Sequence, residues 1–215
     1  LRPSRYMTQL LLKIVDWIQR RVKSEYLRLY KDKLEVKDFT VISNNCWGGI
    51  LYKDLNLPYG TPFVNMFMFA DCYLKLVKNL DRYLASELTL SNVSRYFTDP
   101  SPYPIGFLDD IEIHFIHYTF KDPIIELWNR RKKRINRERI FFVLSERDGC
   151  KPHHVQEFQS LKYNKFAITR YRYSGTDVYR VFPFQSKTVL PADILMGFSY
   201  RAINPVLWLN KTFQK

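Results

Sequence analysis

Three polar side chains alternate with apolar ones in the short segment Asp110-Ile111-Glu112-Ile113-His114. In a β-strand every second side chain points to the same face, so Asp110, Glu112 and His114 would form one row, with neighbouring Cα atoms about 6.6–6.8 Å apart. Two carboxylates and an imidazole in a row suit general acid/base catalysis, in which a carboxylate takes a proton from a hydroxyl group. The row could also contribute ligands to a divalent metal ion, although the sequence does not place the remaining ligands. A solvent-facing edge strand is the alternative interpretation.

A polar turn with two glycines follows the β-branched segment 38–43. Ligands of open α/β sheets bind beyond the carboxyl ends of the strands, and backbone N–H groups at a helix start can hold an anion. The turn therefore predicts a substrate-binding loop, made of Asn44, Asn45, Cys46, Trp47 and Gly48. A purely structural turn around a small buried thiol is the alternative, and a nucleophilic Cys46 would need a lowered pKa.

A strongly basic segment lies between residues 128 and 139, where seven of the residues are Lys or Arg. Helical spacing places Arg131 in the same apolar stripe as Trp128, and a half-buried guanidinium needs a partner. Its planar fork suits a phosphate or a carboxylate, and Asp148 or Glu112 could supply the latter. Asp148 also follows the apolar strand at 140–144, so we expect it at the same carboxyl edge of the sheet as the loop after residue 43. We therefore add Trp128, Arg131 and Arg134 to the predicted substrate-binding residues.

The elements that must position these residues alternate along the chain. Apolar strand patterns occur at 38–43, 63–69, 111–118, 140–144 and 165–171, and helical patterns occur at about 49–55, 71–87, 122–136 and 152–161. Such alternation predicts an α/β fold with three layers, α/β/α, around a mainly parallel or mixed sheet. A hairpin around Ser174-Gly175 would fit the more mixed pattern beyond residue 172.

A long amphipathic helix is predicted over residues 5–35, ahead of this domain. Its apolar stripe comprises Met7, Leu10, Leu11, Ile14, Ile18, Val22 and Leu29. The stripe predicts either packing against the protein core or contact with an anionic membrane surface. We divide the chain into this basic helix, residues 1–37, and a single α/β domain, residues 38–215.

Composition narrows the class of protein. Hydrophobic residues at 46% and aromatic residues at 16% exclude a disordered chain. The formal net charge of +13 favours anionic partners. Nucleic-acid binding is not expected, because no recognised motif occurs and aromatic residues do not alternate with the basic segment. The three cysteines form no CxxC pair, which favours a reducing compartment such as the cytoplasm.

Four segments resemble the domain-of-unknown-function 1919 family, whose members are often described as exopolysaccharide biosynthesis proteins. These are ISNNCWGG (42–49), LPYGTP (57–62), YPIGFLDDIEIHFIHY (103–118) and WNRRKKRIN (128–136). The resemblance covers about residue 38 to the C-terminus. It implies a three-layer α/β fold and a link to bacterial capsule or exopolysaccharide production, and it assigns no reaction and no catalytic residues.

These features together predict a transferase that acts on a phosphate-bearing glycan, either a nucleotide-activated sugar or a polyprenyl-linked glycan. Glu112 or Asp110 would be the base, Arg131 and Arg134 would offset phosphate charge, and Trp47 or Trp128 would stack on a sugar ring. The helix at 5–35 would hold the protein at the inner face of the membrane or in a membrane assembly complex. The alternative is a non-enzymatic binding or scaffold subunit of such a complex.

Overall fold

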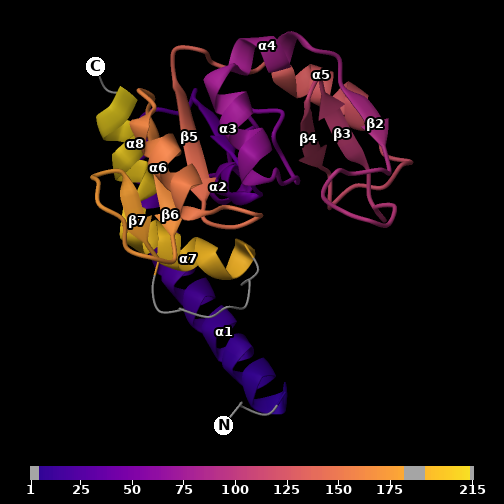
Figure 1. The fold of residues 1–215 in the computed structure, drawn as a ribbon. Helices are drawn as coiled ribbons and strands as arrows, with labels where there is room; N and C mark the ends of the chain where they lie inside the picture. The colour runs from indigo at the N-terminus through magenta and orange to yellow at the C-terminus, as the bar shows by residue number, and fades with distance from the viewer. Residues whose placement is uncertain (1–4, 182–191, 214–215) are drawn as a thin grey trace.

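A parallel sheet of four strands forms the centre of the protein in the computed structural model, which describes residues 5–181 and 192–213 (Figure 1). Its strands are β1 (Thr40–Ser43), β5 (Ile140–Ser145), β6 (Lys165–Thr169) and β7 (Val178–Arg180), adjacent in that order. β1, β5 and β6 are apolar and almost fully buried, as expected for strands covered on both faces. Their alternate side chains therefore fill two separate cores.

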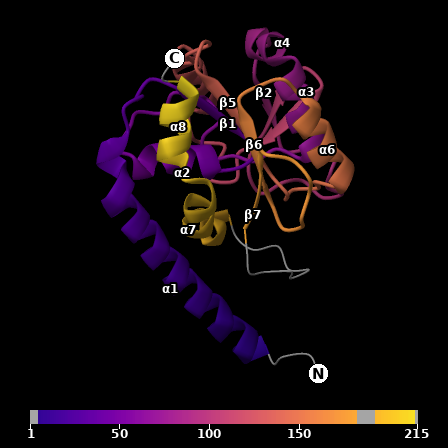
Figure 2. The ribbon, with the colours of Figure 1, turned by 90° about the vertical axis from the view of Figure 1, so that its left-hand side faces the viewer.

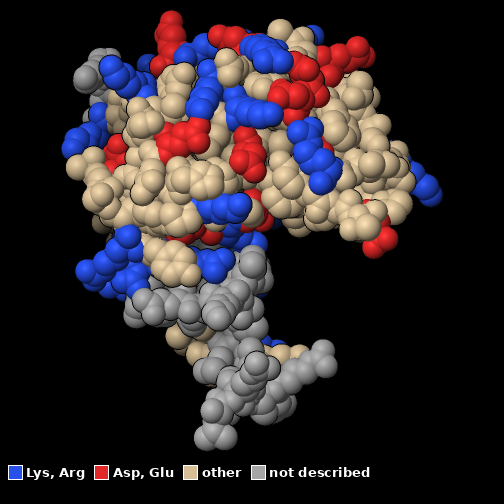
Figure 3. Space-filling view, in the orientation of Figure 1, with Lys and Arg blue, Asp and Glu red and all other residues tan. Residues whose placement is uncertain are grey.

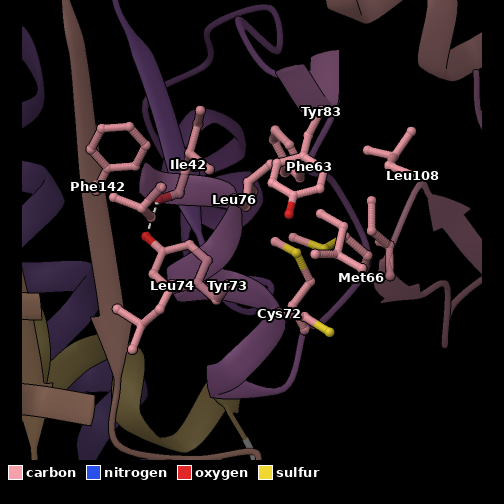
Figure 4. Packing of buried hydrophobic residues seen from close by; sticks show 14 of the residues in the cluster. Ile42, Phe63, Met66, Cys72, Tyr73, Leu74, Leu76, Tyr83, Leu108 and Phe142 are labelled. Atoms are coloured by element: carbon pink, nitrogen blue, oxygen red, sulfur yellow. Dashed lines mark hydrogen bonds between the residues drawn. The ribbon is translucent and has the colours of Figure 1, made fainter. Parts of the chain in front are cut away.

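Helices cover both faces of this sheet (Figure 2). On one face, α3 (Ala70–Lys78) and α6 (Pro152–Ser160) pack over Ile42, Phe142 and Ala167. Figure 4 shows part of this core, where the Tyr73 hydroxyl donates a hydrogen bond to the Ile42 carbonyl at 2.7 Å. On the other face lie α2 (Trp47–Asp54), α7 (Ala192–Ile203) and α8 (Pro205–Phe213), which pack over Val41, Val143 and Phe166 with their neighbours. The three-layer α/β/α prediction is confirmed.

A second, antiparallel sheet stands beside this core (Figure 1). It consists of β2 (Thr89–Ser91), β3 (Ile105–Leu108) and β4 (Ile111–His114), in that order. The strand predicted at 111–118 belongs to this sheet and ends at His114. The segment predicted as a strand at 63–69 is in no named strand and makes one antiparallel bridge, between Phe67 and His114. The hairpin near Ser174 is also wrong, because β6 and β7 run parallel.

Two predicted helices are shorter than expected. The helix at 71–87 is divided at Asn79 into α3 and α4 (Leu80–Ala85). The helix at 122–136 is α5 (Ile124–Lys132), and the Asp122 carboxylate accepts bonds from Thr119 instead of capping the first turn. α5 carries Ile124 and Trp128 into the core between the two sheets.

The N-terminal helix α1 (Arg5–Tyr30) is followed by a short 3₁₀ turn, η1 (Lys31–Lys33). It packs on α7 through the buried residues Gln19 and Tyr26. The two helices touch at Gly197, where an added Cβ would lie 2.0 Å from the Gln19 carbonyl oxygen. The Tyr26 hydroxyl donates to Asn204 at 3.0 Å and accepts from the Val206 amide at 2.9 Å, which ties α1 to the α7–α8 junction.

The N-terminal half of α1 extends away from the body of the protein (Figures 1 and 2). Most of the predicted apolar stripe is therefore exposed, including Leu10, Ile14, Ile18 and Leu29. The side chains of Met7 and Leu11 lie outside the described ones. No described helix is long and apolar enough to cross a membrane.

Candidate functional site

An extended segment, residues 66–70, brings three strand ends together. The Met68 amide donates to the Asn44 carbonyl at 2.8 Å, just beyond β1. Phe67 and His114 exchange two backbone bonds of 3.0 and 2.8 Å at the end of β4, and the Ala70 amide donates to the Asp148 carbonyl at 3.1 Å beyond β5. The segment therefore links the carboxyl edge of the parallel sheet, where α/β proteins bind ligands, to the small sheet.

The predicted loop after β1 uses its polar groups within the protein. The buried Asn44 side chain accepts from the Ser145 amide at 2.8 Å and donates to the Ser145 carbonyl at 3.1 Å, which joins the ends of β1 and β5. At the start of α2, the Trp47 amide donates to Asn45 Oδ1 and the Gly48 amide to Ser43 Oγ, each at 3.0 Å. These two amides are therefore engaged, and the loop positions the sheet edge instead of offering an open anion cradle.

Two further members of this loop also have structural surroundings. Trp47 is buried, and its indole Nε1 donates to Ser199 Oγ at 2.9 Å, so it presents no face to a sugar ring. Cys46 is half-buried, with Sγ 3.6 Å from the Met66 carbonyl. Both side chains hold α2 against its neighbours.

The predicted row on β4 does not share one solvent-facing side. Asp110 lies in the turn before β4. Hydrogen bonds from Lys75, which has the larger effect, and from Tyr83 lower the pKa of its carboxyl to about 2. Glu112 is buried and accepts bonds from Ser94 Oγ, the Arg95 amide and Arg95 Nε. Its carboxylate orders the loop after β2 and also lies beside His114, so two of the three predicted side chains share a face and Asp110 is separate from them.

His114 alone of that row reaches the carboxyl edge. It is fully buried, and neither ring nitrogen has a hydrogen-bond partner within residues 5–181 and 192–213. Burial lowers its pKa to about 4 despite the opposing charge of Glu112, whose Oε2 lies 3.5 Å from Nε2. The imidazole is therefore neutral at pH 7. Five aromatic rings surround it: Phe67, Phe69, Tyr96, Phe97 and Tyr103.

The loop after β5 holds the charged groups of this edge. Glu146 accepts bonds from the Arg170 and Tyr171 amides and from the Tyr173 hydroxyl, so it ties the loop after β6 to β5. Arg147, the next residue, has two buried nitrogens, Nε and Nη1, without a hydrogen-bond partner among the described residues. Buried guanidinium groups normally have an anionic or polar partner, so this one indicates a place for an anion.

Asp148 follows in a left-handed backbone conformation, with φ +50°, and Gly149 continues the turn with φ +74°. Burial raises the pKa of the Asp148 carboxyl to about 6, although the positive charge of Arg147 acts in the opposite direction. Asp148 is thus mainly ionised at pH 7 and titrates near it. A carboxylate with this pKa is suited to accept a proton from a substrate hydroxyl.

An aromatic hollow adjoins these charges. Residues 96–103 line a space of about 490 Å³, in which Phe97 is 40% exposed. Tyr103 lines this hollow, and its pKa is raised by burial and by the nearby charge of Asp148. Exposed aromatic faces next to charged groups are typical of small-molecule sites.

A larger hollow, of about 860 Å³, lies at the amino end of β5 and contains none of the predicted site residues. Among its basic side chains, Lys78, Arg82 and Arg137 already form ion pairs with Glu157, Asp109 and Asp81. Such pairs contribute to the mixed distribution of positive and negative charge on the face in Figure 3. We therefore assign the functional site to the carboxyl edge.

The basic helix α5 takes no part in this site. Trp128 is buried edge-on against Phe63, so its predicted stacking on a sugar is wrong. Arg131 is half-buried as predicted, but Nη1 donates to the Tyr118 hydroxyl at 2.9 Å and the guanidinium lies over the Tyr59 ring. Its partners are therefore aromatic, and neither Asp148 nor Glu112. Arg134 is exposed beyond the end of α5.

Sequence reasoning placed Asp148 at a strand end but missed Arg147, Phe97 and Tyr103. The sequence feature that could have identified Arg147 is the charged segment Glu146-Arg147-Asp148, which lies between an apolar strand and Gly149. Within residues 5–181 and 192–213, no three His, Cys, Asp or Glu side chains gather as a metal site.

Comparisons with known proteins identify a family and assign no reaction. The chain is 33% identical over 162 residues to an uncharacterised protein of Haemophilus influenzae, which covers 75% of this chain and 76% of that protein. Residues 17–204 match the domain of unknown function DUF1919, so the matched region begins within α1. Because this match spans most of the sequence, the chain belongs to the DUF1919 family.

Proposed function

We propose that this protein is a transferase of bacterial surface-polysaccharide biosynthesis that acts on a phosphate-bearing glycan donor at the carboxyl edge of the parallel sheet. The observation that carries this proposal is Arg147, whose Nε and Nη1 are buried without partners in the described part of the chain, next to a carboxylate of raised pKa. The planar guanidinium binds phosphate through two parallel hydrogen bonds, and a buried guanidinium needs such an anion. A nucleotide-activated sugar or a polyprenyl-phosphate-linked glycan supplies that phosphate.

The chemistry would use two adjacent residues. The acceptor hydroxyl oxygen forms a bond to the anomeric carbon of the donor sugar, and the bond between that carbon and the phosphate oxygen breaks. The phosphate leaves with the electron pair and is stabilised by Arg147. Asp148 accepts the proton of the attacking hydroxyl, for which its pKa of about 6 is well matched.

The aromatic hollow would hold the sugar. Phe97 and Tyr103 line the hollow, with Tyr103 close enough to Asp148 to sense its charge, whereas Trp47 and Trp128 are buried. His114 lies behind these rings and supports the hollow from within. We therefore assign proton transfer to Asp148 in place of Asp110 and Glu112.

Binding can be tested by thermal unfolding of the purified protein with nucleotide sugars, nucleoside diphosphates and a short polyprenyl phosphate, each with and without Mg²⁺ or Mn²⁺. A ligand at about 100 times its dissociation constant adds about 2.7 kcal/mol of stability, which raises the melting temperature visibly. We expect Arg147→Ala to abolish this rise. Arg130→Ala, on the exposed side of α5, is the matched control and should retain it.

Catalysis can be tested separately with Asp148→Asn. Asparagine tolerates the left-handed backbone and keeps the shape of the side chain, so the ligand-induced rise should remain. Product formation should fall by about 10²–10⁴-fold, because the proton acceptor is lost. Normal product formation by this variant would refute the assignment of the base. Absence of any ligand response, together with recovery of intact assembly complexes, would favour the scaffold alternative.

A further inference from the structure

The protruding half of α1 carries an apolar face that no described part of the chain covers. Leu10, Ile14, Trp17 and Ile18 are between 39 and 61% exposed. At 100° per residue they fall within an arc of about 100°. The side that packs on α7 is a different one, because it carries the buried residues Gln19 and Tyr26. Four large apolar side chains on one protruding surface indicate an interaction site.

Basic side chains accompany this face. Arg21 lies within the same arc, with its guanidinium 5.4 Å from the centre of the Trp17 ring. Lys13 is exposed about 40° outside the arc, and Arg20, about 60° outside it, forms an ion pair with Asp16 at 2.9 Å. Figure 3 also shows Lys and Arg side chains grouped where α1 leaves the body of the protein. The apolar face is therefore combined with positive charge.

An apolar groove continues the face toward the body. It has a volume of about 430 Å³ and lies between α1 and α7. Its walls include Leu29, Tyr30 and Tyr200, and Arg21 and Arg201 contribute to its lining. Apolar walls with guanidinium groups nearby match an acyl chain that ends in a phosphate headgroup.

We propose that α1 docks this protein on an anionic lipid bilayer through Leu10, Ile14, Trp17 and Ile18, with Arg21 reaching the lipid phosphates. This inference goes beyond the proposed transferase activity and does not depend on it. A tryptophan at the edge of an apolar face is typical of the membrane interface, where its amphipathic ring is favoured. A second copy of the chain is a poorer occupant, because it would bring the same basic face against itself. An anionic surface complements that charge.

The test uses the full 215-residue chain in vesicle flotation. Vesicles of phosphatidylcholine alone are compared with vesicles that contain 30% phosphatidylglycerol, at low and high salt. We expect binding to the anionic vesicles, weakened by salt, together with a blue shift of tryptophan emission. The shift should be absent from a Trp17→Ser protein, because Trp47 and Trp128 are buried and the half-buried Trp208 packs against Phe141 and Phe166 in the core.

Two matched pairs of variants assign the binding to this face. Ile14→Ser with Ile18→Ser should abolish flotation, whereas Ile125→Ser with Leu207→Ser, exposed to a similar degree elsewhere, should not. Arg21→Glu should lower the partition coefficient at least about fivefold, the effect of one charge near an anionic surface, and Arg130→Glu on α5 should change it less.

Three results would overturn the proposal. The first is absence of binding to anionic vesicles. The second is an equal loss of binding in the control variants. The third is a dimer in solution that dissociates in the Ile14→Ser, Ile18→Ser protein, which would show that α1 pairs with a second copy.

Discussion

Replacing Arg147 by methionine should stabilise the ligand-free protein and destroy its binding site. Methionine keeps most of the length of the arginine stem and removes the two buried nitrogens for which the described residues supply no partner. A buried donor without a partner costs about 1–3 kcal/mol. Because Arg147 as a whole is only partly buried, we expect a total gain of about 1–3 kcal/mol in the free energy of unfolding. For a chain of this length, each kcal/mol corresponds to a rise of about 2–4 °C in melting temperature.

The assay is urea and thermal unfolding of the Arg147→Met protein, with and without the donor ligands described above. The variant should melt several degrees higher than the parent without ligand, and ligand should no longer raise its melting temperature. Arg130→Met should change stability by no more than about 0.5 kcal/mol, since that side chain is exposed. A loss of more than 1 kcal/mol in Arg147→Met would refute the reasoning, because it would show that the guanidinium stabilises the folded state.

Four further outcomes are expected from single substitutions. The pKa of Asp148 is raised from 3.8 to about 6 in the folded protein, so its ionisation lowers the free energy of unfolding as the pH rises through 6. The expected loss of stability is about 2–3 kcal/mol. Asp148→Asn should remove this loss, as measured by urea unfolding at a series of pH values. The pKa of His114 is lowered from 6.5 to about 4, so its contribution to stability is present above pH 6.5 and is lost as the pH falls toward 4; His114→Phe should therefore raise the melting temperature more at pH 5 than at pH 7. Glu112→Gln should cost about 1–3 kcal/mol in urea unfolding by weakening its bonds to Ser94 and Arg95, with normal product formation per folded molecule; full stability with lost activity would restore Glu112 as the base. Gly197→Ala should cost about 1–3 kcal/mol and increase amide exchange along α1, because the new Cβ would overlap the Gln19 carbonyl; unchanged exchange would show that the helices adjust without separating.

Much of the layered fold could be predicted from the sequence, because it follows from hydrophobic periodicity. β1, β5 and β6 are buried on both faces and are therefore continuous apolar runs. The sequence did not show that β2, β3 and β4 form a sheet separate from the parallel one. The alternation of residues 110–114 predicts a strand but does not identify the strands that pair with it. β4 is covered on both sides, so its polar side chains Glu112 and His114 are buried.

The functional site was harder to predict, because its properties depend on tertiary contacts. The helical angle of Arg131 correctly indicated partial burial, but Tyr59 and Tyr118, more than ten residues away, supply its partners. Asp148 was placed at the sheet edge by its position after a strand. Its raised pKa depends on how deeply the loop is buried. The unpaired nitrogens of Arg147 depend on which described side chains fold close to it, and neither property can be read from the local sequence.

The contact between α1 and α7 has a consequence for synthesis of the chain. α1 is translated before α7, on which it packs, and the Gly197 crossing cannot form until α7 has left the ribosome. At about 5–20 residues per second, α1 spends roughly 10–40 s without this partner. Its apolar residues are open to chaperones throughout that time, and Leu10, Ile14, Trp17 and Ile18 are still exposed when folding is complete. Loss of the last two helices should therefore leave a nascent chain that aggregates through its first helix.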